Sequence, residues 1–323
     1  MKKPLFSLLL LLLTHLALGQ NNVFIGQYFK IMPTFAPGLT GASNFLDIKT
    51  GTRSQWADVE GAPTTQFFAA NGTIRPGRNA YKYNSHQVDD TSPYAKKPVK
   101  IGLGGYVIND EVGEFRQTEG LISSAVHVNI HRDIHLSLGV SGGINHTRID
   151  VDKLTVKDPA NDDTYKSYLA SGLQRNSLKF LFGLSAHSDQ FYFSYAMMNL
   201  YPSSEHRDVH DRQVAHHIIG GYSYALDSQF ELIPNFHARK ADQQRFLLDI
   251  GARVRYQRNA YAGISYRTNQ YFVSMLGYVV NDLLDIGYSF EWASANSALT
   301  NSGGHEIVIG FRLFNHGKYV PMW

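Results

Sequence analysis

Histidine is the residue type in this sequence that most invites a catalytic or metal-binding interpretation. The chain has fourteen histidines, and His206, His210, His216 and His217 lie near one loop. The i, i+4 spacing of His206 and His210 would suit a metal ion on a helix, but no helical pattern surrounds them. We also find no P-loop and no dinucleotide-binding glycine pattern. We therefore predict no metal, no cofactor and no enzyme, and keep a hydrolase as the least favoured alternative.

Charged side chains form a second candidate group, because they share one face of a series of predicted strands. Positive and negative members are close to balance, and we call them the charge network. Its members are Glu231, Arg239, Asp249, Arg253, Arg255, Arg267, Asp285, Glu291, Glu306 and Arg312. Two interpretations stay open: ion pairs that brace a wall from inside, or a polar vestibule that takes a peptide or a partner segment.

Small residues on the same face would leave room for such a segment. These positions are Gly102, Gly104, Gly139, Ser141, Gly143, Gly251 and Gly287.

Strict alternation of apolar and polar residues positions these charges. Between Phe246 and Phe314 the chain reads as five strands in a row, in which Ile250 and Val254 alternate with Asp249 and Arg253. A two-sheet sandwich also alternates, but its hairpins seldom continue so regularly. Apolar residues facing lipid and polar residues facing a lumen are typical of a closed membrane barrel. We predict an all-β fold, a transmembrane antiparallel β-barrel of about 14 strands and of outer-membrane type.

The first nineteen residues read as a secretory signal peptide. Lys2 and Lys3 precede an apolar run, and a small-x-small cleavage site follows at Ala17 to Gly19. Aromatic residues make up 13% of the chain, mean hydropathy is −0.24, and there is no cysteine. The net charge of +3 is dispersed and gives no indication of nucleic-acid binding. We therefore expect export to the outer membrane of a Gram-negative bacterium and contact with its lipid.

Four segments follow from this pattern. Residues 1–19 are the signal peptide. Residues 20–43 are irregular, because Pro33, Pro37 and Gly38 forbid a regular strand, and we expect them at the periplasmic mouth or inside the lumen. Residues 44–315 form the barrel, with short turns on the periplasmic side and long loops outside, among them one at 109–117. Residues 316–323 are a tail.

One predicted outer loop combines an indole, a carboxylate and a turn-forming Gly-Ala-Pro. We predict that this loop contacts a partner. The alternative is a purely structural role, as a rigid turn with an interfacial tryptophan. The candidate contact residues are Arg53, Gln55, Trp56, Glu60, Gly61, Ala62, Pro63, Thr65 and Gln66.

The same residues carry a family resemblance. Arg53-x-Gln55-Trp56 followed by Glu60-Gly61-Ala62-Pro63-x-Thr65-Gln66 resembles a signature of the PorP/SprF family of type IX secretion outer-membrane proteins of Bacteroidota. So does the run from Gly102 to Gly113. The opening Phe24-x-x-Gln27-Tyr28 and the closing run from Gly303 to Gly310 are similar to the ends of family members. Departures from the family pattern are Met32, Ala36 and Gly304.

The resemblance implies a barrel without enzymatic activity that works with the type IX secretion and gliding machinery. Such a barrel helps to export, or to anchor at the surface, a secreted adhesin through the adhesin's C-terminal domain. The implied partners are that secreted surface protein and periplasmic components, either of the secretion machinery or associated with peptidoglycan. The alternative that stays open is an outer-membrane porin or solute channel.

Overall fold

The computed structural model describes eleven parts of the chain. These are residues 25–56, 59–74, 99–131, 134–150, 161–162, 166, 174–202, 213–242, 246–268, 271–293 and 303–315. The predicted signal peptide, the tail at 316–323, His206 and His210 lie outside the described residues.

Two short 3₁₀ helices precede a succession of strands. The helices are η1 (Tyr28–Thr34) and η2 (Pro37–Leu39). The strands are β1 (Leu46–Gln55), β2 (Thr64–Ile74), β3 (Lys100–Val112), β4 (Phe115–His131), β5 (Ile134–Ile149), β6 (Gln174–His187), β7 (Phe191–Pro202), β8 (Gln213–Tyr222), β9 (Tyr224–Ala225), β10 (Phe230–Ala241), β11 (Leu247–Tyr256), β12 (Ala260–Arg267), β13 (Tyr271–Val280), β14 (Leu284–Ala293) and β15 (Gly304–Leu313).

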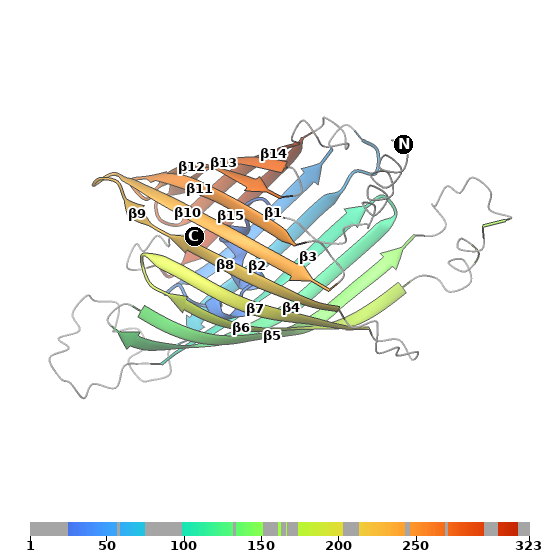
Figure 1. The fold of residues 1–323 in the computed structure, drawn as a ribbon, viewed down its shortest axis with the longest axis horizontal. Coiled ribbons are helices and arrows are strands. Elements are labelled where there is room, and N and C mark those ends of the chain that lie inside the picture. Colours follow the sequence, from blue (N-terminus) through green and yellow to red (C-terminus); the bar gives the residue numbers. More distant parts are fainter. Residues whose placement is uncertain are drawn as a thin grey trace, which may run out of the picture.

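The strands form one closed antiparallel barrel (Figure 1). Strands that follow one another in the chain pair with each other, except β8 and β9; β15 pairs with β1, and β10 pairs with β11. Because β8 and β9 both pair with β10, they act as one interrupted strand, and the fifteen strands make a barrel of fourteen. The predicted fold class is confirmed. Among the described residues, no helix is long and apolar enough to cross a membrane.

The outer surface of the barrel is apolar, with aromatic residues near both rims. In β11 the outward Ile250 is 53% exposed, whereas the inward Asp249 is 5% exposed. Exposed aromatic residues gather at two levels, as in the interfacial girdles of membrane barrels. One level has Tyr222, Tyr224, Phe230, Tyr256 and Tyr278, and the other has Phe115, Tyr201, Phe246, Tyr266 and Trp292.

The lengths of the connections orient the barrel. At the end where β4 meets β5 and β11 meets β12, most strands join within a few residues, apart from residues 75–99 between β2 and β3. The opposite end carries the longer connections after β1, β5, β7 and β14. Outer-membrane barrels have short periplasmic turns and longer extracellular loops, so we assign the first end to the periplasm and the second to the cell exterior.

The predicted loop at 109–117 is wrong. Strand β3 continues to Val112, β4 begins at Phe115, and these two residues pair with each other. Gly113 has a φ of 56°, which allows the chain to reverse within two residues. The polar residues from Asn109 onward resembled a loop because they stand in the extracellular part of the hairpin, where strands carry polar side chains.

Residues 25–45, which we call the plug, fill the lumen. Most of their side chains are buried, including Gln27 and Met32, both 0% exposed. Proline at 33 and 37 prevents strand pairing, and the segment folds into η1 and η2 instead. The described part of the predicted irregular segment, residues 25–43, lies in the lumen.

Three of the lumenal glycines expected to leave room for a partner are in contact with the plug. A Cβ atom at Gly139 would lie 2.2 Å from the carbonyl oxygen of Pro37, and one at Gly102 would lie 1.8 Å from that of Thr40. At Gly287 it would lie 2.3 Å from Oε1 of Gln27. The expectation that these positions leave space for a partner is therefore wrong, because the protein's own amino-terminal segment occupies it.

We expect Gly139→Ala to lower the free energy of unfolding by about 1–3 kcal/mol, because the added methyl group meets backbone atoms that cannot move aside. Urea unfolding of the refolded barrel measures this. Gly142→Ala in the same strand is the matched control, since its Cβ would meet only the Phe180 ring at an ordinary 3.4 Å. Equal stability of the two variants would contradict the tight fit of the plug.

Candidate functional site

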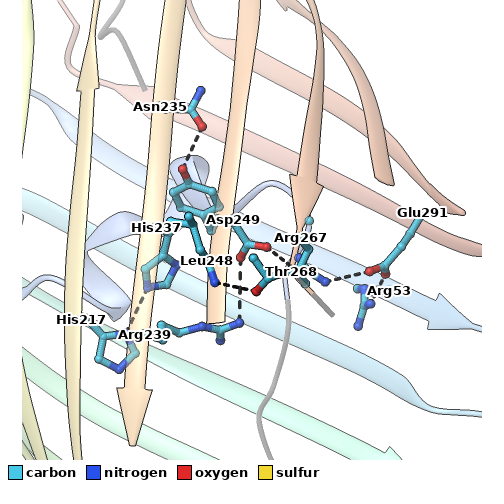
Figure 2. A network of polar contacts seen from close by, with 12 residues as sticks. Arg53, His217, Asn235, His237, Arg239, Leu248, Asp249, Arg267, Thr268 and Glu291 are labelled. Carbon is cyan, nitrogen blue, oxygen red and sulfur yellow. Dashed lines mark hydrogen bonds and ion pairs between the residues drawn. The ribbon is translucent and has the colours of Figure 1, made fainter. Parts of the chain in front are cut away.

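A chain of ion pairs links five strands on one wall of the lumen (Figure 2). Arg267 of β12 bonds both to Asp249 of β11, at 2.5 Å, and to Glu291 of β14, at 2.7 Å. Glu291 also binds Arg53 of β1, and Asp249 lies 3.9 Å from Arg239 of β10. Buried carboxylates here always face a cationic partner, which offsets the cost of taking them out of bulk water.

A second group of charges surrounds Asp285 near the periplasmic end. Its carboxylate accepts from Lys30 of the plug at 2.5 Å and lies 3.3 Å from Arg312 and 3.5 Å from Lys49. Lys49 in turn pairs with Asp47 at 2.5 Å. Burial lowers the pKa of Lys30 to about 8, while the negative charge of Asp285 opposes that shift. This group therefore ties the plug to β14, β15 and β1.

The remaining members of the charge network have different partners. Glu231 binds Arg255 and lies 3.3 Å from the largely exposed Arg258 at the periplasmic turn. Glu306 accepts from the backbone N–H groups of Gly26, at 2.6 Å, and Gln27, at 2.8 Å. The guanidinium of Arg253 stacks 3.5 Å above the Phe29 ring. Glu306 and Arg253 thus hold the plug.

The sequence prediction of this network omitted Lys30, Lys49, Asp47 and Arg53. For the three residues of β1, the alternation of the strand was a usable signal. Asp47, Lys49, Gly51 and Arg53 occupy every second position, so their side chains face the lumen together. Nothing in the sequence placed Lys30 opposite Asp285, because residues 20–43 have no strand periodicity.

The opposite wall, β4 to β7, offers small residues and histidines in place of most charges. His127 contacts the carbonyl oxygen of Thr40 through Nε2 at 2.8 Å. Gly38 of η2 lies so close to Ser185 that a Cβ on it would meet Oγ at 2.3 Å. The second helix of the plug therefore rests on a smooth wall, while the first is held by charges.

The histidines singled out in the sequence do not converge. His216 points outward and bonds to the Tyr195 hydroxyl at 2.8 Å, whereas His217 lies in the lumen 3.0 Å from His237. Within the described ranges no group of three or more histidine, cysteine or acidic residues could hold a metal ion.

Sequence reasoning passed over one serine motif. Gly139-Val140-Ser141-Gly142-Gly143 has the Gly-x-Ser-x-Gly spacing of a hydrolase nucleophile elbow. Such an elbow requires a sharp turn from a strand into a helix. Here the motif lies in the middle of β5, and Ser141 is buried against the lumen. The residue spacing of a nucleophile elbow is therefore present, but the strand-to-helix turn that exposes the serine is not.

The nine candidate contact residues do not form one surface. Arg53 and Thr65 point into the lumen, where Thr65 donates to Asp110 at 2.5 Å. Gln66 points outward and lines a groove on the membrane-facing side of β15, β1, β2 and β3. The backbone at Gln55 continues β1. Glu60 and Gly61 are exposed in the connecting loop, whereas Pro63 is buried.

Backbone hydrogen bonds hold this extracellular loop in place. Gln55 N–H donates to Pro63 at 2.9 Å, and Trp56 N–H donates to the carbonyl oxygen of Gly303 at 3.1 Å. Gly113 N–H donates to the carbonyl oxygen of Gly61 at 2.8 Å. Trp56 is thereby joined to the start of β15, and Gly61, next to Glu60, is joined to the β3–β4 turn.

A cavity of about 120 Å³ lies above the plug, in the extracellular half of the lumen. We call it the vestibule. Thr34 and Phe35 of the plug contribute to its lining, and Phe35 stacks on His217 with a ring-centre distance of 5.9 Å. Its walls come from β3 to β8, β10 and β11.

Comparison with known proteins identifies the family. The family model described as "Type IX secretion system membrane protein PorP/SprF" matches residues 17–311. The chain belongs to the PorP/SprF family. As a PorP/SprF protein with a closed membrane barrel, it is an outer-membrane component of type IX secretion, a system whose other components are its expected partners. No curated protein matches the sequence.

Two solved structures are similar to this PorP/SprF protein at low identity. The outer membrane protein Omp33 of Acinetobacter baumannii is 11% identical with a TM-score of 0.43, covering 85% of this chain and 100% of that one. The toluene transporter TodX of Pseudomonas putida is 9% identical with a TM-score of 0.45, covering 90% of this chain and 94% of that one.

We expect Arg267→Leu to lower the free energy of unfolding by about 3 kcal/mol, because it leaves two buried carboxylates without their shared partner. Arg258→Ala is the matched control. It also removes an arginine from an acidic partner, but Arg258 is exposed, so the free energy of unfolding should fall by less than about 1 kcal/mol. Urea denaturation compares them. A similar small loss in both would mean that the ion-pair chain does not brace the wall.

Proposed function

We propose that this PorP/SprF protein is a sealed outer-membrane platform that helps to export or anchor a secreted surface adhesin, held through the adhesin's C-terminal domain. The observation that carries this proposal is the plug. It occupies the lumen and is bound to the wall by Asp285, Glu306 and Arg253. A barrel filled in this way offers a partner its extracellular rim and vestibule. The periplasmic end is then available to peptidoglycan-associated or secretion components.

Two features support the extracellular rim as the contact surface. Trp56 and Gly61 are hydrogen-bonded to two neighbouring connections, which holds these two positions in place before a partner binds. Glu60 is exposed and Trp56 half-buried at this rim, and tryptophan is prominent among residues that dominate binding energy.

The alternative, a porin or solute channel, requires a continuous water-filled path. In this structure Tyr28, Phe29 and Met32 lie in one buried apolar cluster with Tyr192 and Ile233 of the wall. A solute would have to displace that cluster together with the ion pair between Lys30 and Asp285. The packing of the plug therefore favours anchoring over conduction.

Mild-detergent purification from the native organism, followed by mass spectrometry, tests the proposed function. We expect a large secreted protein to copurify and to be retained through its C-terminal end. A barrel that copurifies with no secreted protein would overturn the proposal.

We expect the wild-type protein to show no conductance in planar bilayers, because the plug is bound on both sides. Lys30→Asp should produce discrete openings, since it places a carboxylate against Asp285 and releases η1. Arg258→Asp, a charge reversal at an exposed position, serves as the control and should stay closed. Steady wild-type conductance would instead support the solute channel.

We expect replacement of both Trp56 and Glu60 by alanine to release the client into the medium while the barrel stays folded. Trp292→Ala is the control, because Trp292 is also an aromatic residue at the extracellular end but points outward. Immunoblots of cells and medium report the client, and retarded migration of unheated samples reports unfolding. Unchanged surface retention would remove residues 56–60 from the contact surface.

A further inference from the structure

The apolar outer surface of the barrel is interrupted at β1. The outward residues of β11 stay apolar or aromatic along the whole strand, from Leu248 to Tyr256. In β1 they change from aliphatic to polar half-way along, where Ile48 is followed by Thr50 and Thr52. These two threonines are the fifth and seventh of the ten residues of β1. A strand of this length spans the bilayer, so both side chains lie within the hydrophobic band.

A groove of about 480 Å³, which we call the lateral groove, follows the polar part of β1. Thr50 and Thr52 line it, together with Phe68 and Val107 on the β2–β3 side and Ile307 on the β15 side. Phe68 is 51% exposed and Ile307 is 46% exposed. The groove therefore exists because short side chains of β1 lie between longer side chains of the neighbouring strands.

The lateral groove contains two polar groups that make no hydrogen bond. Thr52 and Gln66 stand directly opposite each other in the register of β1 and β2. The Thr50 hydroxyl beside them donates to the carbonyl oxygen of Phe67 at 3.0 Å. In the part of the chain that the structure describes, neither the Thr52 hydroxyl nor the Gln66 amide has such a partner. Hydrocarbon offers no hydrogen bond, so both groups carry the free-energy cost of unsatisfied polar groups.

Other polar side chains on this surface are paired within the wall. The Tyr195 hydroxyl bonds to His216 at 2.8 Å, and the Tyr288 hydroxyl bonds to His305 at 2.8 Å. The Gln66 amide, in contrast, requires a partner from outside the barrel. A lipid acyl chain has no hydrogen-bonding group, so a protein is the occupant that meets this requirement.

A second copy of the chain meets the requirement by symmetry. Copies in one membrane share their orientation and depth, so a two-fold axis along the membrane normal and through the groove brings Gln66 opposite Gln66. A primary amide both donates and accepts, and two of them therefore form a reciprocal pair. Such an interface uses the same surface on both copies, and the exposed Phe68 ring of each copy would enter the groove of the other.

We infer that the lateral groove is the interface of a two-fold symmetric dimer of this barrel, with a pair of Gln66 amides at its centre. The dimer does not depend on the secreted client, and it uses a face of the barrel that the proposed anchoring leaves free. Two extracellular rims then stand side by side in the membrane.

Fluorescence energy transfer between copies in vesicles of phosphatidylcholine and phosphatidylglycerol measures this dimer. Because the sequence has no cysteine, Leu283→Cys in the exposed turn between β13 and β14 gives the full-length chain a single site for a donor or acceptor dye. Dilution with lipid yields the dissociation constant. We expect Gln66→Leu, which keeps the size of the side chain, to raise this constant about tenfold, because two symmetry-related hydrogen bonds are lost.

A filling variant tests the location. Thr50→Trp places an indole in the lateral groove and should abolish energy transfer between copies. Ile264→Trp is the matched control, since Ile264 is also outward and 51% exposed but lies on β12, outside the groove. This control should dimerise like the wild type. Faster migration before heating shows that each variant has folded.

Three results would overturn the dimer. The first is a wild-type protein that shows no energy transfer at any ratio of protein to lipid. The second is energy transfer that persists in folded Thr50→Trp, and the third is an unchanged dissociation constant in Gln66→Leu, which keeps the test decisive if Thr50→Trp does not fold.

Two differently tagged copies, expressed together in the native organism, test the same interface in its own membrane. We expect each tag to copurify with the other from wild type and from Ile264→Trp, but not from Thr50→Trp. A different membrane protein that copurifies in place of the second copy, and is lost in Thr50→Trp, would overturn the second copy as the occupant of the groove.

Discussion

The structure depends on the burial of charged groups between the plug and one wall of the barrel. Asp285 meets Lys30, and Glu306 accepts two backbone N–H groups of the plug. Without the plug, Glu306 would lose both of these donors and Asp285 would lose one of its three cationic partners, so the wall is complete only when the plug is in place. The plug in turn has little structure of its own, since its two 3₁₀ helices are too short to be stable alone. Barrel and plug therefore stabilise each other.

The two walls of the lumen hold the plug in different ways. The wall from β10 to β1 holds η1 by charge, whereas Gly139, Gly183 and Ser185 on the other side let η2 approach the backbone closely. The ion pairs fix the position of η1, and the small residues of the other wall let η2 pack tightly. As a result Phe35 comes to the base of the vestibule. The extracellular half of the lumen thus contains a cavity whose base is formed by the plug.

Family membership gives these features a biological setting. The protein is a type IX secretion membrane protein, and its plug packs against the barrel wall inside the lumen. Above the plug, backbone hydrogen bonds join Trp56 to the start of β15 and Gly61 to the β3–β4 turn.

Much of the barrel follows from local properties of the chain. Alternation with a period of two decides which side chains face lipid and which face the lumen, and it depends only on neighbouring residues. The strand number and the inward direction of Asp249, Arg253 and Glu291 could therefore be predicted. The hairpin at Gly113 could not, because polar residues at a rim resemble a loop and only the positive φ of one glycine reveals the turn.

The fold class, the family resemblance and the lumenal set of charges follow from the residues alone. Which charges meet depends on the tertiary structure, since Arg53 and Glu291 are 238 residues apart and Gly26 and Glu306 are 280 apart. The tertiary structure also decides that three lumenal glycines receive the plug and that the residues from Arg53 to Gln66 divide between three surfaces. These outcomes depend on closure of the barrel, which brings distant strands together, and no local pattern encodes that distance.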